Sequence, residues 1–292
     1  MNEKIDLAII GGSGFYSMEG LTDTVEKTMD TPFGNPSSPI IIGSLEGKRV
    51  AFLARHGIGH FINPTEVNYR ANIYALKMLG VEQIVSISAC GSLREDYKPG
   101  DIVIPDQVFD NTKERSRTFF ANGLAAHIGS ADPFCPDLSQ RTWEAAAKTC
   151  ATVHQGGTLI TIEGPRFSTK AESNVFRAWG MSIIGMTASP EVFLAREAEI
   201  CYTTMAHVTD YDVWHISAEP VTVEMVIHTL NKNTKIAQES IRNILKEMDH
   251  KQYCACSSAL ADAIITNHAV IKNDSIKRLG ILVQKYLQPK TE

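Results

Sequence analysis

The sequence has no long hydrophobic run. No apolar stretch among its 292 residues approaches the roughly 20 residues that a membrane-spanning helix requires. It also has no block rich in Lys and Arg, and its formal net charge of −5 argues against a nucleic-acid-binding surface. The short segment before Gly11 lacks the features of a secretory signal peptide. We therefore expect a cytoplasmic protein that binds neither membranes nor nucleic acid.

The sequence also lacks a paired CxxC motif of the kind that binds zinc, and its six cysteines are too sparse for a disulfide scaffold. We expect reduced structural thiols. Cys254 and Cys256 stand out, because a disulfide across one intervening residue is strained and easily reduced. A redox or thermostability role for this pair stays open as the alternative.

Repeats, low-complexity tracts and linker-like segments are absent, and a single domain over residues 1–292 fits the length. The first half alternates β-rich runs with helical patterns, which predicts a layered α/β domain around a largely buried sheet. A helix is expected over residues 63–80, with Asn63 and Pro64 at its start and Gly80 at its end. From Val221 onward we expect C-terminal helices, the last over residues 274–288.

A glycine-rich corner, Gly11-Gly12-Ser13-Gly14, follows the first predicted strand. A dinucleotide-binding loop would need glycine or alanine at position 17, a helix starting in the corner, and a second strand leading to an acidic residue about 20 residues on. Ser17 stands there instead, and residues 17–34 show neither a helical period nor a strand pattern. The corner is either a tight turn or a nest of backbone N–H groups for a small anion, to which Ser13 adds a hydroxyl.

Polar side chains follow other predicted strands. Arg55, His56 and His60 lie within six residues, and a guanidinium beside an imidazole suits an oxyanion. Structural histidines are the alternative, and zinc is disfavoured because neither a helical spacing nor an acidic residue accompanies the pair. Hydroxyl groups occupy two more predicted corners, at Ser88 and Thr187.

Asp210 and Asp212 lie two residues apart at the end of the last strongly apolar strand. If the strand continued, both carboxylates would face the same side of the sheet. Paired acids perform general acid–base chemistry when burial and mutual repulsion keep one of them protonated. A helix N-cap or a solvated turn is the alternative interpretation.

Taken together, these corners resemble the methylthioadenosine phosphorylases, in the trimeric branch of the purine nucleoside phosphorylase family. The resemblance runs in order from about Ile9 to Trp214, and the remaining C-terminal stretch matches only loosely. The motifs that carry it include IIGGSGFY, TPFG.P, ARHG..H, ACGSLRE, PFCP, TIEGPRFS, MT..PEV and TDYD.W.

The resemblance implies a single-domain, three-layer α/β/α fold with a central mixed sheet, assembled as a homotrimer or as a dimer of trimers. It implies phosphorolysis, in which phosphate attacks C1′ of 5′-methylthioadenosine and releases adenine and 5-methylthioribose 1-phosphate. No organic cofactor and no metal is expected. A phosphorylase of inosine, guanosine or methylthioinosine, a non-catalytic purine-binding protein and a nicotinamide-dependent oxidoreductase are the alternatives.

The resemblance also assigns residues to roles. Asp210 would hold purine N7 and act as the catalytic acid, with Asp212 supporting the contact to N6; the 6-oxopurine phosphorylases carry Asn where this chain has Asp210. The phosphate-binding positions it implies are Ser13, Arg55, His56, Ser88, Ala89 and Thr187. The other substrate contacts it implies are Phe167, Ser168, Met186, His60, Val223, Val226, Ile227 and, from a neighbouring subunit, His127. From spacing alone, the apolar positions 223, 226 and 227 are equally compatible with a helical core stripe.

Overall fold

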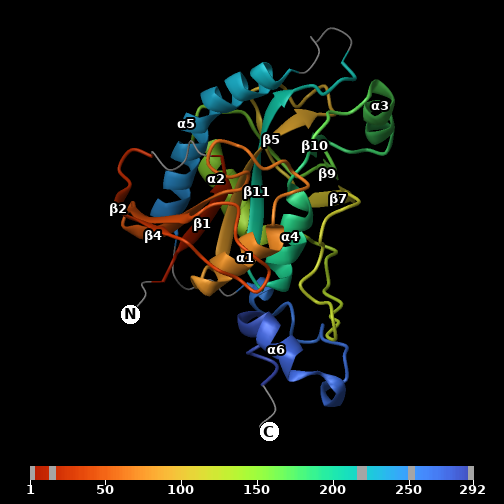
Figure 1. The fold of residues 1–292 in the computed structure, drawn as a ribbon. Coiled ribbons are helices and arrows are strands. Elements are labelled where there is room, and N and C mark those ends of the chain that lie inside the picture. Colours follow the sequence, from red (N-terminus) through yellow and green to blue (C-terminus); the bar gives the residue numbers. More distant parts are fainter. Residues whose placement is uncertain (1–3, 13–17, 216–221, 249–253, 289–292) are drawn as a thin grey trace.

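The computed structural model describes residues 4–12, 18–215, 222–248 and 254–288. Eleven strands in these ranges form one mixed sheet (Figure 1). The strands are β1 (Leu7–Gly11), β2 (Thr22–Lys27), β3 (Ile40–Leu45), β4 (Lys48–Ala54), β5 (Gln83–Ser92), β6 (Ile102–Ile104), β7 (Gln107–Asn111), β8 (Val153–Gln155), β9 (Thr158–Ile162), β10 (Ile183–Gly185) and β11 (Cys201–Asp210). The helices are α1 (Tyr69–Met78), α2 (Pro136–Ala147), α3 (Lys170–Ala178), α4 (Ala188–Glu197), α5 (Val223–Glu247) and α6 (Asn273–Leu279), with short 3₁₀ turns η2 (Ala255–Ser258), η3 (His268–Val270) and η4 (Gly280–Leu282).

The sheet branches at β5. Its main path runs β2-β3-β4-β1-β5-β10-β9-β7, while β11 pairs with β5 and leads on to β6 and β8. Strands β1, β4, β5 and β11 are parallel, so their carboxyl ends meet at one edge of the sheet. Strand β10 runs antiparallel to β5 and therefore returns alongside it.

Helices cover both faces of the sheet. The side chains of β1 therefore alternate between two hydrophobic cores, one on each face. Leu7 and Ile9 pack in the core that contains residues of α2 and α5. Ala8 and Ile10 pack in the core that contains residues of α1 and α4. The three-layer α/β/α architecture is therefore confirmed, and Figure 1 shows α5 and α4 on opposite sides of β11.

The predicted start of the first helix is wrong. Helix α1 begins at Tyr69, and the Asn68 side chain caps it by accepting from the Ala71 N–H at 3.2 Å. Asn63 instead closes a turn, in which its Oδ1 accepts from the backbone N–H of Thr65 at 2.9 Å. An Asn-Pro pair is equally suited to a turn and to a helix start, and here the later asparagine is the cap.

Two further expectations are corrected. Residues 17–34 show no strand pattern, yet β2 lies there as an edge strand, and its side chains are almost all exposed, so no apolar alternation marks it. The expected helix over 274–288 ends at Leu279, because Gly280 adopts a φ of +48° and 3₁₀ turns follow. In the described residues no helix is both long and apolar enough to cross a membrane. The single domain over residues 1–292 stays a prediction.

Candidate active site

Arg55 lies at the edge of the sheet where the parallel strands have their carboxyl ends. It follows β4 directly, and its backbone N–H donates to the carbonyl of Gly11, the last residue of β1, at 3.2 Å. This places the arginine beside the glycine corner, as the sequence predicts. Ser13 itself lies outside the described residues.

The Arg55 side chain is 3% exposed and forms a bidentate ion pair with Glu191 of α4, which is fully buried. Nε donates to Glu191 Oε2 at 2.8 Å and Nη2 donates to Oε1 at 2.9 Å. The Tyr202 hydroxyl donates to the same Oε1 at 2.8 Å. Burial alone would lower the pKa of Arg55, but Glu191 holds it above its ordinary value. The ion pair therefore fixes both the charge and the orientation of the guanidinium.

One N–H of the Arg55 guanidinium has no hydrogen-bond partner among the described residues. Nη2 donates its second hydrogen to Ser86 Oγ at 2.6 Å, and Nη1 donates one hydrogen to the Ile87 carbonyl at 3.3 Å. Arginine carries five N–H groups, so one on Nη1 remains for a ligand. Because Ser86 and Ile87 immediately precede Ser88, this donor lies next to the predicted anion-binding positions on β5.

His56 and His60 stack with ring centroids 4.3 Å apart. His56 Nδ1 lies 2.9 Å from the Ile62 carbonyl, and because a carbonyl only accepts, Nδ1 carries the proton. Burial, with a contribution from Arg55, lowers the pKa of His56 to about 4. The ring is therefore neutral at pH 7, and its Nε2 is an acceptor. His60 is exposed and adopts a φ of +58°.

Ser88 does not lie at a corner as expected; it lies inside β5, half-buried beside Ala89. A run of small residues is typical of a turn in sequence. Here it lies in a central strand and lets neighbouring segments of the backbone approach that strand closely. The antiparallel return of β10 brings the next segment to it, since a Cβ on Gly185 would lie 3.8 Å from the Ala89 carbonyl. Thr187 follows as the N-cap residue of α4, 8% exposed and with no capping hydrogen bond from its side chain. Its hydroxyl is therefore not used by the helix.

Asp210 and Asp212 come together through a turn rather than along a strand. Strand β11 ends at Asp210, and Asp212 adopts a φ of +51° and donates its backbone N–H to Asp210 Oδ1 at 2.7 Å. The Thr209 hydroxyl donates to Asp210 Oδ2 at 2.7 Å. Both acids are buried, at 7% and 6% exposed, and burial raises the pKa of each; Asp212 raises that of Asp210 further. The solvated-turn alternative does not hold for carboxyls at this depth.

Gly91 gives the two acids their space. A Cβ at this position would lie 2.9 Å from Asp210 Oδ1 and 3.2 Å from Asp212 Cβ. The turn is tied back to the same strand by Trp214, whose indole N–H donates to the Ser92 carbonyl at 2.7 Å. Position 91, in the ACGSL motif, therefore requires glycine because a side chain there would collide with Asp210 and Asp212.

The predicted purine-contacting residues differ in burial. Phe167 is 38% exposed, Met186 is half-buried, and Ser168 is 8% exposed with a hydroxyl that has no hydrogen-bond partner among the described residues. Ser168 lines a cavity of about 130 Å³ with Gly164 and Phe176. That volume is below the roughly 300–1,000 Å³ of ordinary ligand pockets, so this cavity alone does not hold a nucleoside.

Arg115 was missed in the sequence, and it supports the loop that precedes α4. The Arg115 side chain is 1% exposed, and its guanidinium donates to the carbonyls of Met186 at 2.6 Å, Ser189 at 2.7 Å and Glu163 at 2.7 Å. Glu191 was missed as well. Its sequence context could have revealed it, because a glutamate between Pro190 and Val192 in an otherwise apolar stretch indicates a buried charge that needs a partner.

Several predicted residues are not brought to these groups. Val223 and Ile227 lie in the first turns of α5, 62% and 52% exposed, and the Val226 side chain lies outside the described part. His127 is exposed, and its backbone N–H donates to the Ala263 carbonyl at 2.8 Å. Figure 1 shows the segment between β7 and α2 running away from the sheet toward α6. Within one chain, His127 is therefore on a segment that packs with the C-terminal region.

Comparisons with known proteins agree with this geometry. The family model described as the Phosphorylase superfamily matches residues 6–246. The S-methyl-5′-thioadenosine phosphorylase of Geobacter sulfurreducens is 52% identical over 282 residues, which is 96% of this chain and 99% of that protein. The structure of a methylthioadenosine phosphorylase from an Antarctic soil metagenomic library superposes with a TM-score of 0.92 at 45% identity, covering 97% of this chain and 99% of the other.

A methylthioadenosine phosphorylase from Schistosoma mansoni, solved in complex with adenine, superposes with a TM-score of 0.84 at 35% identity, covering 90% of this chain and 99% of the other. The family match, the near full-length relatives and the structural neighbours all lead to the same assignment. The chain belongs to the phosphorylase superfamily and, within it, to the family of the methylthioadenosine phosphorylases.

Proposed function

We propose that the chain catalyses phosphorolysis of S-methyl-5′-thioadenosine. A phosphate oxygen attacks C1′, the C1′–N9 bond breaks, and the products are adenine and 5-methylthioribose 1-phosphate. Inorganic phosphate is the second substrate, and the reaction uses no organic cofactor and no metal. The observation that carries the proposal is the buried pair Asp210 and Asp212 at the sheet edge where Arg55 also lies.

Phosphate binds, in this proposal, among Ser13, Arg55, His56, Thr187 and the β5 positions Ser88 and Ala89. The spare N–H on Arg55 Nη1 and the uncommitted Thr187 hydroxyl supply directed donors, and the Nε2 of the neutral His56 accepts a hydrogen bond from a protonated phosphate oxygen. Held beneath the sugar, the anion is both the nucleophile and a counter-charge to the cationic ribose that forms as the bond breaks. His60, stacked on His56, borders the ribose.

Asp210 handles the charge that develops on the leaving purine. Breaking the glycosidic bond pushes electrons onto the base, and a proton delivered or shared at N7 stabilises it. A carboxyl suits this role only when it holds its proton near neutral pH, and burial raises the pKa of Asp210 in that direction. Asp212 accepts from the exocyclic N6 amine, and Phe167, Ser168 and Met186 border the base. An acceptor at Asp212 favours adenine, whose N6 amine donates, over a 6-oxopurine, whose O6 is itself an acceptor.

The 5′ substituent is selected by an apolar wall formed by Val223, Val226 and Ile227. Two of these side chains are exposed in a single chain, although isoleucine and valine gain free energy from burial. A methylthio group would contact them favourably, whereas a 5′-hydroxyl would find no hydrogen-bond partner there. A wall of this kind favours methylthioadenosine over adenosine.

We propose a homotrimer in which His127 of one subunit reaches the 5′ side of the neighbour's site. The exposure of His127, and its attachment to a segment that runs away from its own sheet, support this assignment. A solution mass measurement distinguishes a single trimer from a dimer of trimers. Because the substrates are intracellular metabolites of salvage, we place the enzyme in the cytoplasm.

The test follows adenine release from methylthioadenosine with and without phosphate. We expect release that depends on phosphate and is accompanied by 5-methylthioribose 1-phosphate. Release that ignores phosphate would identify a hydrolase, and binding without release would identify a purine-binding protein. A preference for inosine, guanosine or methylthioinosine would move the chain to the 6-oxopurine phosphorylases. Asp210→Asn should abolish release while circular dichroism remains unchanged.

A further inference from the structure

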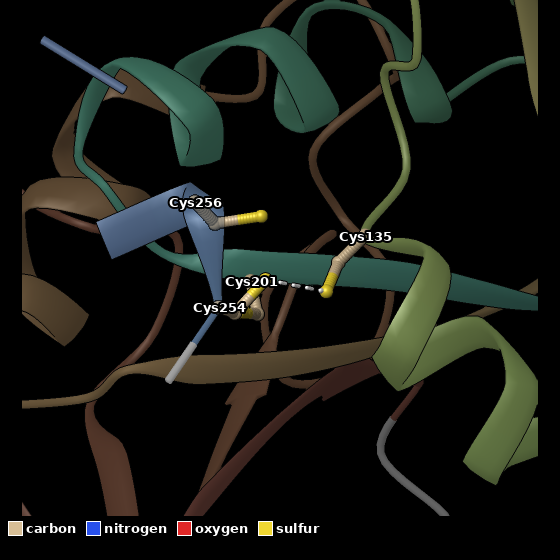
Figure 2. Close-up of side chains that lie close together, drawn as sticks. All are labelled: Cys135, Cys201, Cys254 and Cys256. Carbon is tan, nitrogen blue, oxygen red and sulfur yellow. Dashed lines mark hydrogen bonds between the residues drawn. The ribbon is translucent and has the colours of Figure 1, made fainter. Parts of the chain in front are cut away.

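Four cysteines that are scattered in the sequence converge at one place in the fold (Figure 2). Cys135 is the N-cap residue of α2, Cys201 is the first residue of β11, and Cys254 and Cys256 flank the start of η2. All four sulfur atoms lie within 4.8 Å of one another, and the Cys135 and Cys254 sulfurs are 3.4 Å apart. In the described residues this is the one group of three or more side chains that could hold a metal ion.

The spacing of the sulfurs fits a tetrahedral zinc site. A Zn–S distance of about 2.3 Å places the corners of a tetrahedron about 3.8 Å apart. That value lies between the 3.4 Å separation of the Cys135 and Cys254 sulfurs and the 4.8 Å limit within which all four sulfurs lie. We propose that Cys135, Cys201, Cys254 and Cys256 bind one zinc ion through four thiolates. With four protein ligands such a site has no open position, so its role is structural rather than catalytic. The proposal is independent of the reaction.

Disulfides explain the cluster less well. All four cysteines are free, and the bonds that would use Cys254 and Cys256 together span a single intervening residue, which strains the linkage. The two pairings that avoid this bond, Cys135–Cys254 with Cys201–Cys256 and Cys135–Cys256 with Cys201–Cys254, need two disulfides side by side, and disulfides are rare in reducing compartments. A metal ion uses all four sulfurs at once, and metal binding is the more common reason for clustered cysteines in reducing compartments.

The surroundings also suit thiolate ligands. The Leu138 backbone N–H donates to Cys135 Sγ at 3.5 Å, and Cys135 lies at the N-terminus of the 12-residue helix α2, whose dipole favours negative charge. Four thiolates around Zn²⁺ carry a net charge of −2, so such donors are what the site requires. Cys135 and Cys256 are buried at 1% and 4% exposed, which protects the metal–sulfur bonds from solvent.

A metal here would join three parts of the chain that meet only in the folded state. It would tie the segment beginning at Cys254, which continues into α6, to α2 and to the start of β11. The same C-terminal segment pairs with the loop of His127, through the bridge between Ala126 and Ile264. Zinc would therefore stabilise the platform on which the His127 loop rests.

The first experiment measures zinc in the full-length chain, purified anaerobically without chelators, by inductively coupled plasma mass spectrometry. We expect about one zinc ion per chain. The double variant Cys254→Ser/Cys256→Ser should lose it. The control Cys150→Ser, which changes an exposed cysteine outside the cluster, should retain it. Zinc retained by the double variant, or zinc absent from the unaltered chain even after incubation with zinc chloride and a thiol reductant, would overturn the proposal.

A second measurement does not depend on the variants folding. Cobalt(II) exchanged into the unaltered chain should give the visible ligand-field bands and the sulfur-to-metal charge transfer of a tetrahedral thiolate site. Alkylation of the denatured chain without reductant, after chelation, should modify all four cysteines. If mass spectrometry instead finds cluster cysteines joined in disulfides in the anaerobically prepared protein, the cluster is a redox element and not a metal site.

Discussion

Two buried glutamates on the same helix are expected to respond in opposite ways to replacement by glutamine. Glu191 and Glu197 both lie on α4 and are 0% and 5% exposed. Glu191 binds Arg55 through two hydrogen bonds, whereas Glu197 accepts from the Thr118 hydroxyl at 2.6 Å and from the Phe119 backbone N–H at 2.7 Å. The pair therefore separates the effect of a counter-charge from the effect of a buried carboxylate.

Glu191→Gln removes the negative charge beside the buried guanidinium of Arg55. Leaving one partner of a buried ion pair without its counter-charge costs about 3–5 kcal/mol of unfolding free energy. The guanidinium would also lose one of the two bonds that orient it, so we expect the KM for phosphate to rise at least about tenfold, equivalent to about 1.4 kcal/mol. The KM for methylthioadenosine should change much less.

Glu197→Gln should leave stability near that of the unaltered chain at pH 5 and should make the variant more stable than the unaltered chain at pH 8. Burial raises the pKa of Glu197 from 4.5 to about 7. Between these two values the folded chain holds a proton that the unfolded chain has released, so stability falls as pH rises through this window. The loss amounts to about 3 kcal/mol and is complete above pH 7. The glutamine does not titrate, so the variant should lack this part of the pH dependence.

The assay is urea unfolding at pH 5 and pH 8, at one protein concentration, combined with initial rates at varied phosphate. The reasoning on the ion pair is refuted if Glu191→Gln loses less than about 1 kcal/mol at pH 8. A full loss of stability with an unchanged KM for phosphate would keep the ion pair and remove Arg55 from phosphate binding. Equal pH profiles for Glu197→Gln and the unaltered chain would contradict the raised pKa.

Two variants and one pH–rate profile of the unaltered chain probe the acids and the 5′ pocket. Gly91→Ala should lower kcat at least about tenfold, because its Cβ would lie 2.9 Å from Asp210 Oδ1 and displace the acid; unchanged kcat with an intact circular dichroism spectrum would argue against the placement. In the unaltered chain kcat should fall on the alkaline side as Asp210 loses its proton, and pH–rate profiles test this, a flat profile speaking against an acid role. Val226→His should improve adenosine relative to methylthioadenosine, since imidazole can bind a 5′-hydroxyl; an unchanged ratio of kcat/KM values would indicate that this helical stripe is only packing.

The sequence reveals the features of this fold that depend on neighbouring residues. Apolar runs predict the buried strands, and Arg55 and Asp210 are correctly placed at strand ends because each interrupts or ends such a run. Strand β2 was missed because an exposed edge strand buries neither face and leaves no apolar alternation. Gly280 breaks the terminal helix although its neighbours keep a helical period, since a positive φ is a property of one residue.

What the sequence does not reveal are partnerships between distant residues. Arg55 and Glu191 are 136 positions apart, and no local pattern links a basic residue after one strand to an acidic residue in a later helix. Cys135 and Cys254 are 119 positions apart and meet only because α2 begins where the C-terminal segment packs. Ser88 looked like a turn residue because small residues predict turns, although in a central strand they permit close approach.

The charges around the proposed phosphate site explain why a nearly neutral clamp suits this chemistry. Glu191 balances the charge of Arg55, and with the pKa of His56 lowered to about 4 the imidazole adds none at neutral pH. Phosphate would then be held by directed N–H and O–H donors rather than by net positive charge. Net positive charge in the pocket would withdraw electron density from the phosphate oxygens that attack C1′ and that stabilise the cationic sugar. The bound phosphate stays reactive because the site orients it firmly while neutralising little of its charge. The buried Glu191 produces both effects, since it balances the charge of Arg55 and fixes the orientation of the guanidinium.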